Sequence, residues 1–131
     1  MKRKQDCHKT DSLDSIKNVR HKKQINKLRL GNHNLRIETG RHNKTPENLR
    51  TCYLCNSNQI EDESHFLFSC EHYHDTRKKY FDEINDKYRN FNDLDNISKI
   101  MFLFNNVDPF VCRTIAAYIY DSMLNRQSML A

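Results

Sequence analysis

Glycine and proline are scarce in this chain of 131 residues, with two of each, and tryptophan is absent. So few turn-forming residues argue against a β-sandwich or β-barrel, whose many short strands need frequent turns. No apolar run approaches the ~20 residues of a membrane-spanning helix, and the densest run covers only residues 100–104. The N-terminus is charged and lacks the apolar stretch of a secretory signal. These absences predict a helical protein without a membrane partner and with an intracellular location, nuclear or cytoplasmic.

Apolar side chains are also few, because hydrophobic residues make up 37% of the chain and charged residues 30%. A small domain with so thin a core commonly depends on a disulfide or a metal ion for stability. The chain has five cysteines, an odd number that does not fit a fully paired disulfide framework. Three of them lie with a histidine at the spacing of a metal site, which favours a reducing compartment.

These cysteines lie in the segment CYLCNSNQIEDESHFLFSC, which covers residues 52–70. Cys52 and Cys55 form a C-x2-C pair, and His65 follows after nine intervening residues and Cys70 after four more. A C-x2-C turn can direct both sulfurs to one point, and a short helix with its following turn can supply the other two ligands. Three thiolates and one imidazole complete the tetrahedral shell of a structural zinc site and leave no position open for catalysis. We therefore predict Zn²⁺ as a structural cofactor.

Three other features in or directly after this segment allow alternative interpretations. His72 and His74 are rival ligands, although His72 would leave a spacer of one residue and the histidine already named has sufficient spacing. The acidic run 61–63 is compatible with an acid–base or magnesium site, but Asp62 as the N-cap of a short helix is the simpler interpretation. Tyr53, between the first two ligands, could stack on a base. Because a small zinc module needs a local core, we favour packing of this ring over the knuckle.

The net charge of +5 conceals a difference between the two parts of the chain. Residues 1–50 contain 14 Lys and Arg against 5 Asp and Glu, whereas residues 51–131 contain 8 against 12. A basic half of this kind favours a polyanionic partner, RNA or DNA, although simple solvation of the charges is the alternative. The predicted phosphate contacts are Lys22, Lys23, Lys27, Arg29, Arg36, Arg41, Lys44, Arg50, Arg77, Lys78 and Lys79.

The N-terminal half is expected to begin with a disordered basic tail over residues 1–12, which have almost no apolar side chains. A basic helix is then predicted to start at Leu13. Gly31 weakens the middle of this helix, and Gly40 is predicted to end it. The apolar stripe that defines the helix consists of Leu13, Ile16, Val19, Ile25, Leu28 and Leu35.

The C-terminal half has three further segments with helical spacing of apolar residues. An amphipathic helix with aromatic residues on one face is predicted over 72–89, and a second helix over 97–104 with Ile97, Ile100, Met101 and Phe104 as its apolar stripe. Asp108 and Pro109 form an N-cap and first helical position. The helix that they start is predicted to bury Val111, Cys112, Ile115, Tyr118, Ile119 and Met123.

The predicted fold class is therefore mostly α, a small helical domain built around a CCHC zinc knuckle with a disordered basic N-terminus. We divide the chain into the tail 1–12, a module 13–90 that contains the basic helix, the zinc site and the helix after it, and a C-terminal helical segment 91–131 that packs on this module. No internal repeat is present in the sequence.

The segment from about Gln24 to Tyr80 resembles the reverse-transcriptase zinc-binding region of non-LTR retrotransposons. The matching residues are KLRLGNHNLRIETGRHNKTPENLRTCYLCN and EDESHFLFSCEHYHDTRKKY. This resemblance implies that the four residues of the CCHC motif bind zinc. It also implies that the module assists a polymerase by gripping element RNA or target DNA during target-primed reverse transcription.

A polymerase needs paired carboxylates for magnesium, as in Tyr-x-Asp-Asp, and the sequence has no such set; Tyr120 and Asp121 provide a single acid. We therefore expect a non-enzymatic protein, a C-terminal fragment or derivative of such an element. Its expected function is zinc-dependent binding of RNA or DNA through the basic helix. The alternative is a structural or protein-interaction zinc module that docks on the reverse-transcriptase body or on another chain.

Overall fold

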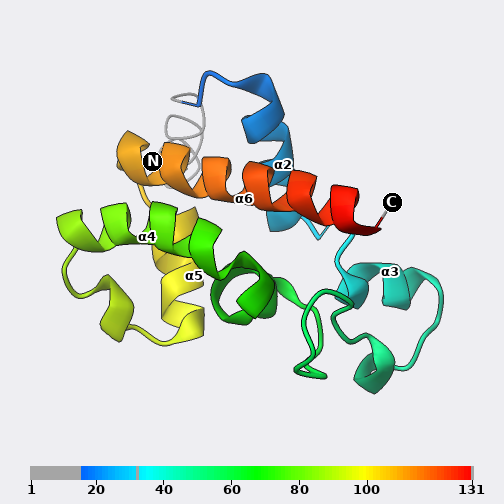
Figure 1. The fold of residues 1–131 in the computed structure, drawn as a ribbon. Coiled ribbons are helices and arrows are strands. Elements are labelled where there is room, and N and C mark those ends of the chain that lie inside the picture. Colours follow the sequence, from blue (N-terminus) through cyan, green and yellow to red (C-terminus); the bar gives the residue numbers. More distant parts are fainter. Residues whose placement is uncertain (1–15, 32, 131) are drawn as a thin grey trace, which may run out of the picture.

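The computed structural model describes residues 16–31 and 33–130, so the predicted tail 1–12 and the predicted helix start at Leu13 lie outside the described residues. Within these ranges the secondary structure is helical, apart from one isolated antiparallel bridge between Thr51 and Ile60 (Figure 1). The predicted fold class, mostly α, is confirmed. None of the helices in the described ranges combines the length and the apolar character that a bilayer crossing requires.

Helix α6 (Pro109–Leu130) runs through the middle of the molecule, and α2 and α4 pack against it (Figure 1). It begins as predicted, because the Oδ1 atom of Asp108 accepts a hydrogen bond from the amide of Phe110 at 2.9 Å. Proline is favourable at the first helical position, because an amide hydrogen there would have no acceptor within the helix and its absence costs nothing. The predicted core face of this helix is confirmed, and its buried members include Val111, Cys112, Ile115, Tyr118, Ile119 and Met123.

The basic segment, predicted as one helix, forms two helices, α2 (Val19–Arg29) and α3 (Arg36–His42). Gly31 separates them, because its φ of 70° lies in the left-handed region that glycine adopts at little cost. The prediction that Gly40 ends the helix is wrong, since this residue lies inside α3. A Cβ atom at this position would lie 2.5 Å from Cγ of Arg50, so close packing and not a helix end accounts for the glycine.

The apolar stripe of the basic segment is confirmed in part. Its buried members are Ile16, Ile25, Leu28 and Leu35. Val19 is 77% exposed, which corrects the prediction. The side chain of Asn18 caps α2, so the helix begins only at Val19 and Ile16 does not share its periodicity. Val19 and Leu28 are nine positions apart, which places the two side chains on opposite sides of the helix at 3.6 residues per turn.

Helix α4 (His74–Lys87) covers most of the predicted amphipathic segment and follows the short 3-10 helix η3 (Glu71–Tyr73). Its residues Phe81 and Ile84 are buried, in agreement with the predicted aromatic and apolar face. The ring of Phe81 lies 5.1 Å from that of Tyr118 on α6, measured between centroids. Aromatic contacts therefore join the two helices along the core.

Helix α5 (Asn96–Phe104) has the predicted extent, and its predicted apolar stripe is confirmed in part, because Ile100 and Phe104 are partly buried and pack against the core. Leu103 is buried, whereas Ile97 and Met101, both in the predicted stripe, are 72% and 58% exposed. The reason is the packing of Phe102, whose ring lies 5.5 Å from that of Phe91 in the short helix η4 (Phe91–Asp93). Phe102 and Leu103 therefore pack toward the body, and Ile97 and Met101 are left in solvent.

Candidate metal centre

Cys52 and Cys55 lie on a short hairpin that extends from the helical body beside α3 (Figure 1). The arms of the hairpin are joined by the bridge between Thr51 and Ile60. The chain turns at residues 56–58, where Asn58 adopts a φ of 60°, a left-handed conformation that asparagine tolerates better than most residues. The turn reverses the chain and leaves both cysteines on the side that faces the next helix.

His65 and Cys70 are supplied by the short helix η2 (His65–Ser69), which has π-type hydrogen bonds. The Oδ1 atom of Asp62 accepts a hydrogen bond from the amide of His65 at 2.8 Å, so the predicted cap is confirmed. The amide of Cys70 donates to the carbonyl of His65 at 2.8 Å. This wide i to i+5 turn brings the cysteine back toward the imidazole.

The four predicted ligands come together in the structure. Their ligand atoms all lie within 4.8 Å of one another, with 3.9 Å between the sulfurs of Cys52 and Cys70 and 3.4 Å between the sulfur of Cys55 and Nε2 of His65. Zn–S bonds of about 2.3 Å and Zn–N bonds of about 2.0 Å require tetrahedral edges of roughly 3.8 Å and 3.5 Å. The observed distances match these edges. They exceed by far the ~2.05 Å of a disulfide, so the cluster fits a metal ion.

A side-chain amide orients the imidazole of the cluster. Nδ1 of His65 lies 3.0 Å from Oε1 of Gln59, which assigns a proton to Nδ1 and leaves the lone pair of Nε2 directed at the sulfurs. Such hydrogen bonds fix the tautomer and the ring orientation of a metal-ligating histidine. Gln59 was not predicted as a partner of His65. The feature that could have indicated it is its position on the hairpin arm that leads to the histidine.

Hydrogen-bond donors also surround the sulfurs. The amide of Leu54 donates to the sulfur of Cys52 at 3.4 Å, and the hydroxyl of Ser57 lies 3.1 Å from the sulfur of Cys55. One backbone amide and one hydroxyl of the hairpin turn thus point back at the sulfurs. They disperse the negative charge that a set of three thiolates would concentrate.

Ionisation of the ligands is coupled. The hydrogen bond from Cys70 lowers the pKa of the Cys52 thiol, and the same contact raises the pKa of Cys70. Hydrogen bonding to the Cys52 sulfur raises the pKa of His65. One thiolate is therefore favoured and further negative charge is opposed. A bound dication would remove that opposition, because metal binding and ligand deprotonation are linked.

The acidic run 61–63 anchors the hairpin to the helical body. Both carboxylate oxygens of Glu61 accept hydrogen bonds from the guanidinium of Arg126 on α6, at 2.8 and 2.7 Å, and both side chains are buried. Oε1 of Glu61 also accepts a hydrogen bond from the amide of Arg36 at the start of α3, at 2.8 Å. No sequence pattern indicated the ion pair, because its partners are 65 residues apart.

A second group, His33, Glu38 and Glu63, also has ligand atoms within 4.8 Å of one another. Nδ1 of His33 accepts a hydrogen bond from the amide of Leu35 at 3.2 Å, so the ring proton lies on Nε2. Nε2 then donates to Glu63 at 2.7 Å and has no lone pair for a metal. This group is best described as a buried histidine paired with a carboxylate.

Three of the predicted phosphate-contacting residues hold backbone carbonyls around the cluster. The guanidinium of Arg36 donates to the carbonyls of Thr51 and Leu49 at 3.2 and 3.0 Å. That of Arg77 donates to the carbonyls of Leu67 and Cys70 at 2.9 and 2.8 Å. Arg50, two residues before Cys52, donates to the carbonyl of Ile37 within α3 and to that of Thr45 before η1 (Glu47–Leu49). These arginines position the segments that carry the ligands.

Three other predicted residues have local partners at the surface. Arg41 pairs with Glu38 and Lys78 with Asp82, and both contacts link residues three or four apart on one helix. Nζ of Lys79 lies 4.9 Å from the ring centroid of Tyr80. Exposed pairs of this kind are weak, so these cations stay available to a stronger anionic partner.

The remaining predicted contacts lie on or after α2. Lys22, Lys23, Lys27 and Arg29 belong to α2, and Lys44 follows α3 with a φ of 60°. Within the described ranges, no hydrogen bond or ion pair engages the side chains of Lys23, Lys27, Arg29 and Lys44. The structure therefore brings the metal ligands together but leaves the predicted cations spread over α2, α3 and α4.

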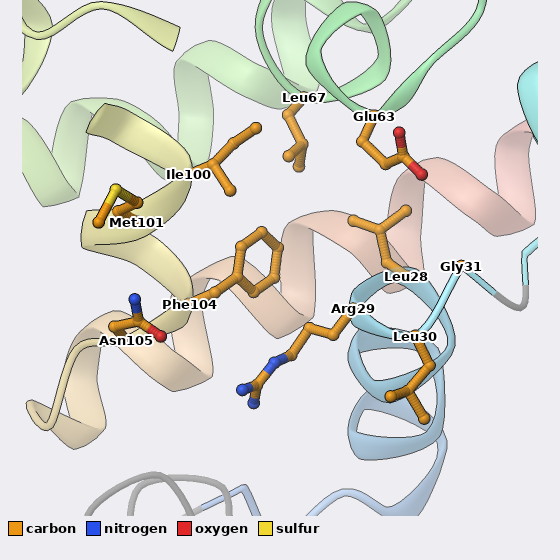
Figure 2. A pocket seen from close by; sticks show the side chains of 10 residues that line it. All are labelled: Leu28, Arg29, Leu30, Gly31, Glu63, Leu67, Ile100, Met101, Phe104 and Asn105. Atoms are coloured by element: carbon orange, nitrogen blue, oxygen red, sulfur yellow. The ribbon is translucent and has the colours of Figure 1, made fainter. Parts of the chain in front are cut away.

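A separate cavity of about 580 Å³ lies between the C-terminal end of α2 and α5 (Figure 2). Its walls are mostly apolar and include Leu28, Ile100 and Phe104. The side chains of Arg29 and Glu63 lie at its edge. The sequence analysis did not predict this cavity, because it depends on how the exposed side of α5 faces α2.

No family model, curated protein or solved structure matches this chain. The fold and the site define the class of the protein as a small helical protein with a Cys3His cluster that can hold a metal ion. The resemblance to a reverse-transcriptase zinc-binding region stays a prediction.

Proposed function

We propose that this protein is a zinc-dependent nucleic-acid-binding module, in which Zn²⁺ closes the hairpin and α2 contacts the phosphates of RNA or DNA. The choice of zinc is supported by the donor set, because three sulfurs and one nitrogen in a tetrahedral arrangement suit this ion. Cys52, His65 and Cys70 are buried and Cys55 is half-buried, which fits a structural site without an open position.

The observation that carries the proposal is the charge of α2. Its eleven residues include five Lys and Arg and no acidic residue, and the sequence has no Asp or Glu from residue 15 to residue 37. Ile25 and Leu28 fix one side of the helix to the body, while Lys23 is exposed and Lys27 half-exposed. Like charges on one helix repel one another, and a polyphosphate would relieve that repulsion.

We also propose that the module derives from the C-terminal part of a non-LTR retrotransposon reverse transcriptase. The support is the order of features along residues 24–80: a basic helical segment, the sequence ETGR, a C-x2-C pair, and HFLFSC before an aromatic helix. In such an element the module would hold RNA or DNA for the polymerase and would not carry out polymerisation itself.

A salt titration tests nucleic-acid binding. The slope of log K against log salt should be negative and should flatten by about 0.9 for each phosphate contact that is removed. Lys27→Glu should weaken binding and reduce the slope. Arg89→Glu is the matched control, because it makes the same change in charge at an exposed residue after α4. A slope near zero with both single-stranded RNA and duplex DNA would contradict the proposal.

A second candidate function, docking on another polypeptide, is favoured by the cavity of Figure 2. Arg29 at its edge has no partner within the described residues, and Leu30 and Met101 nearby are 79% and 58% exposed. Such a surface fits an apolar partner segment with an acidic side chain, for example from a reverse-transcriptase body. Met101→Asp should abolish this docking and leave binding of nucleic acid unchanged, whereas Lys27→Glu should have the reverse effect.

A further inference from the structure

Tyr53 lies on the hairpin between Cys52 and Cys55, and its side chain is exposed. We expected this ring to pack in a local core over the knuckle, and that expectation is wrong, because Tyr53 is 64% exposed. Its neighbour Leu54 is partly buried and packs against the core instead. The ring of Tyr53 therefore does not contribute to the local core of the module.

One contact holds the ring of Tyr53. The guanidinium of Arg36 lies over it, with 4.2 Å between Cζ and the ring centroid. This guanidinium is itself fixed by its hydrogen bonds to the carbonyls of Thr51 and Leu49. A planar cation that is already immobilised thus supports one face of the ring.

The surroundings of the ring make it a rigid surface. The cysteines on both sides belong to the metal cluster, so a bound ion would fix the backbone that carries Tyr53. A ring that is exposed and held before binding loses little conformational entropy when a ligand stacks on it. The chemical group that this surface fits is flat and aromatic, and the cation beneath it favours a ligand that also carries negative charge.

We infer that Tyr53, supported by Arg36, is a stacking platform for one unpaired base of a single-stranded nucleic acid. This inference rests on the proposed function and deepens it, because it assigns the single strand as the preferred substrate class. The bases of a duplex are stacked on their neighbours, and their faces are not accessible to a side chain. Unpaired bases expose these faces, and every base has one, so the platform has little sequence preference.

The assignment divides the work between two surfaces. The cations of α2 contact phosphates, which single strands and duplexes share, whereas Tyr53 contacts a group that only the single strand presents. Arg36, predicted as a phosphate contact, is a positioning residue in this arrangement. Its hydrogen bonds to carbonyls orient the guanidinium that lies against the ring.

The experiment compares ligands of equal charge with and without bases. The probes are a thymidine oligomer of about ten nucleotides, within the usual site size of a single-strand binding surface, an abasic oligomer with the same number of phosphates, and a DNA duplex. Their affinities are measured for the metal-loaded wild-type chain and for Tyr53→Ala, Tyr53→Phe and Tyr53→Leu. Leu49→Ala is the matched control, because the Leu49 side chain is also exposed and the carbonyl of this residue accepts a hydrogen bond from Arg36.

Tyr53→Ala should bind the thymidine oligomer about tenfold more weakly, the effect expected for loss of one stacked base, and should bind the abasic oligomer and the duplex as the wild type does. Tyr53→Phe should keep the affinity, Tyr53→Leu should lose most of it, and Leu49→Ala should be neutral. Because the ring is exposed, metal content and thermal melting should not change in any of these variants.

The outcomes separate this inference from the proposed function. Suppose that the wild type binds all three probes with a salt-dependent affinity. If Tyr53→Ala then lowers the affinity for all three probes by the same factor, or for none of them, the platform is refuted and nucleic-acid binding stands. If the wild type binds none of the probes, the proposed function fails and the platform fails with it.

Discussion

The metal end of the molecule, residues 36–70, and its helical body, formed by α2, α4, α5 and α6, are held together by different interactions. Helix α6 buries ten residues, whereas α3 buries only Gly40 and η1 buries none. Within the metal end, Phe66 and Leu67 of η2 are fully buried in the core, so η2 is held by apolar packing, whereas α3, η1 and the hairpin bury little apolar surface. The segments of the metal end are connected by directed contacts, namely the arginine bonds to carbonyls, the cap by Asp62 and the cluster of ligands.

This difference indicates which part of the fold depends on a bound ligand. Apolar packing of the body needs no bound ion, whereas the metal end brings three sulfurs into close proximity, an arrangement that a bound cation would stabilise. The ring of Phe66 packs in the core of the body, with 5.8 Å between its centroid and that of Tyr118. Polar contacts between the two parts are also buried. The ion pair of Glu61 with Arg126 is one, and the hydrogen bond from the hydroxyl of Tyr118 to the carbonyl of Phe66, at 2.8 Å, is another.

The largest expected effect comes from loss of the metal. Cys55→Ser should release the ion and unfold the module, because the binding free energy of a structural zinc ion is folding free energy, on the order of 10 kcal/mol. Metal analysis and thermal melting followed by circular dichroism would measure this. Cys112→Ser is the matched control, since Cys112 is buried on α6 outside the cluster and should keep one equivalent of metal.

Retention of both the metal and the cooperative melt by Cys55→Ser would show that the cluster is not structural. Partial unfolding of Cys55→Ser would locate the boundary between the two parts. If the variant loses its metal but keeps the helical signal of the body, then the hairpin unfolds separately. The boundary between the two parts then lies at the Glu61–Arg126 contact.

The next effect concerns this contact between the two parts. Arg126→Met should lower the free energy of unfolding by about 3–5 kcal/mol, because it leaves the carboxylate of Glu61 buried without its partner. The double variant Glu61→Gln, Arg126→Met should recover much of the loss, since it removes the uncompensated charge. Urea unfolding of the two variants and the wild type measures both values, and wild-type stability of Arg126→Met would show that the ion pair does not join the two parts.

The sequence predicted the metal ligands and the body for one physical reason, which is that both depend on local spacing. The interval between Cys52 and Cys55 and the periodic residues of α6 are readable without knowledge of distant contacts. The same holds for caps such as Asp62 and Asp108, whose partners lie two or three residues away.

The features that the sequence did not predict depend on distant partners. Glu61 and Arg126 are 65 positions apart in the sequence. Arg36 is 13 and 15 positions from Leu49 and Thr51, whose carbonyls accept its hydrogen bonds. The exposure of Tyr53 and Met101 likewise depends on which neighbours pack beside them. A helical wheel assigns one apolar face to α5, but the ring of Phe102 decides which face is buried.

The smallest expected effect lies in the body, and its dependence on pH distinguishes the body from the metal end. Hydrogen bonds from Lys87, which has the larger effect, and from Tyr88 lower the pKa of Asp108 to about 2, from an ordinary value of 3.8. A carboxyl group with a lowered pKa stabilises the fold above its unfolded pKa, and that contribution is lost as the pH falls through the folded pKa. The contribution of Asp108 should therefore disappear between about pH 4 and pH 2.

Asp108→Asn isolates this charge, because asparagine keeps an oxygen that can accept the capping hydrogen bond from Phe110 while it removes the ion pair with Lys87. At pH 7 the variant should be less stable by about 1 kcal/mol, a modest value because Lys87 is half exposed. Urea unfolding from pH 7 to pH 2 should show the difference between wild type and variant fall toward zero. Acid also releases metal, but it does so equally in both proteins. A difference that stays constant down to pH 2 would therefore place the effect in the cap and not in the charge of Asp108.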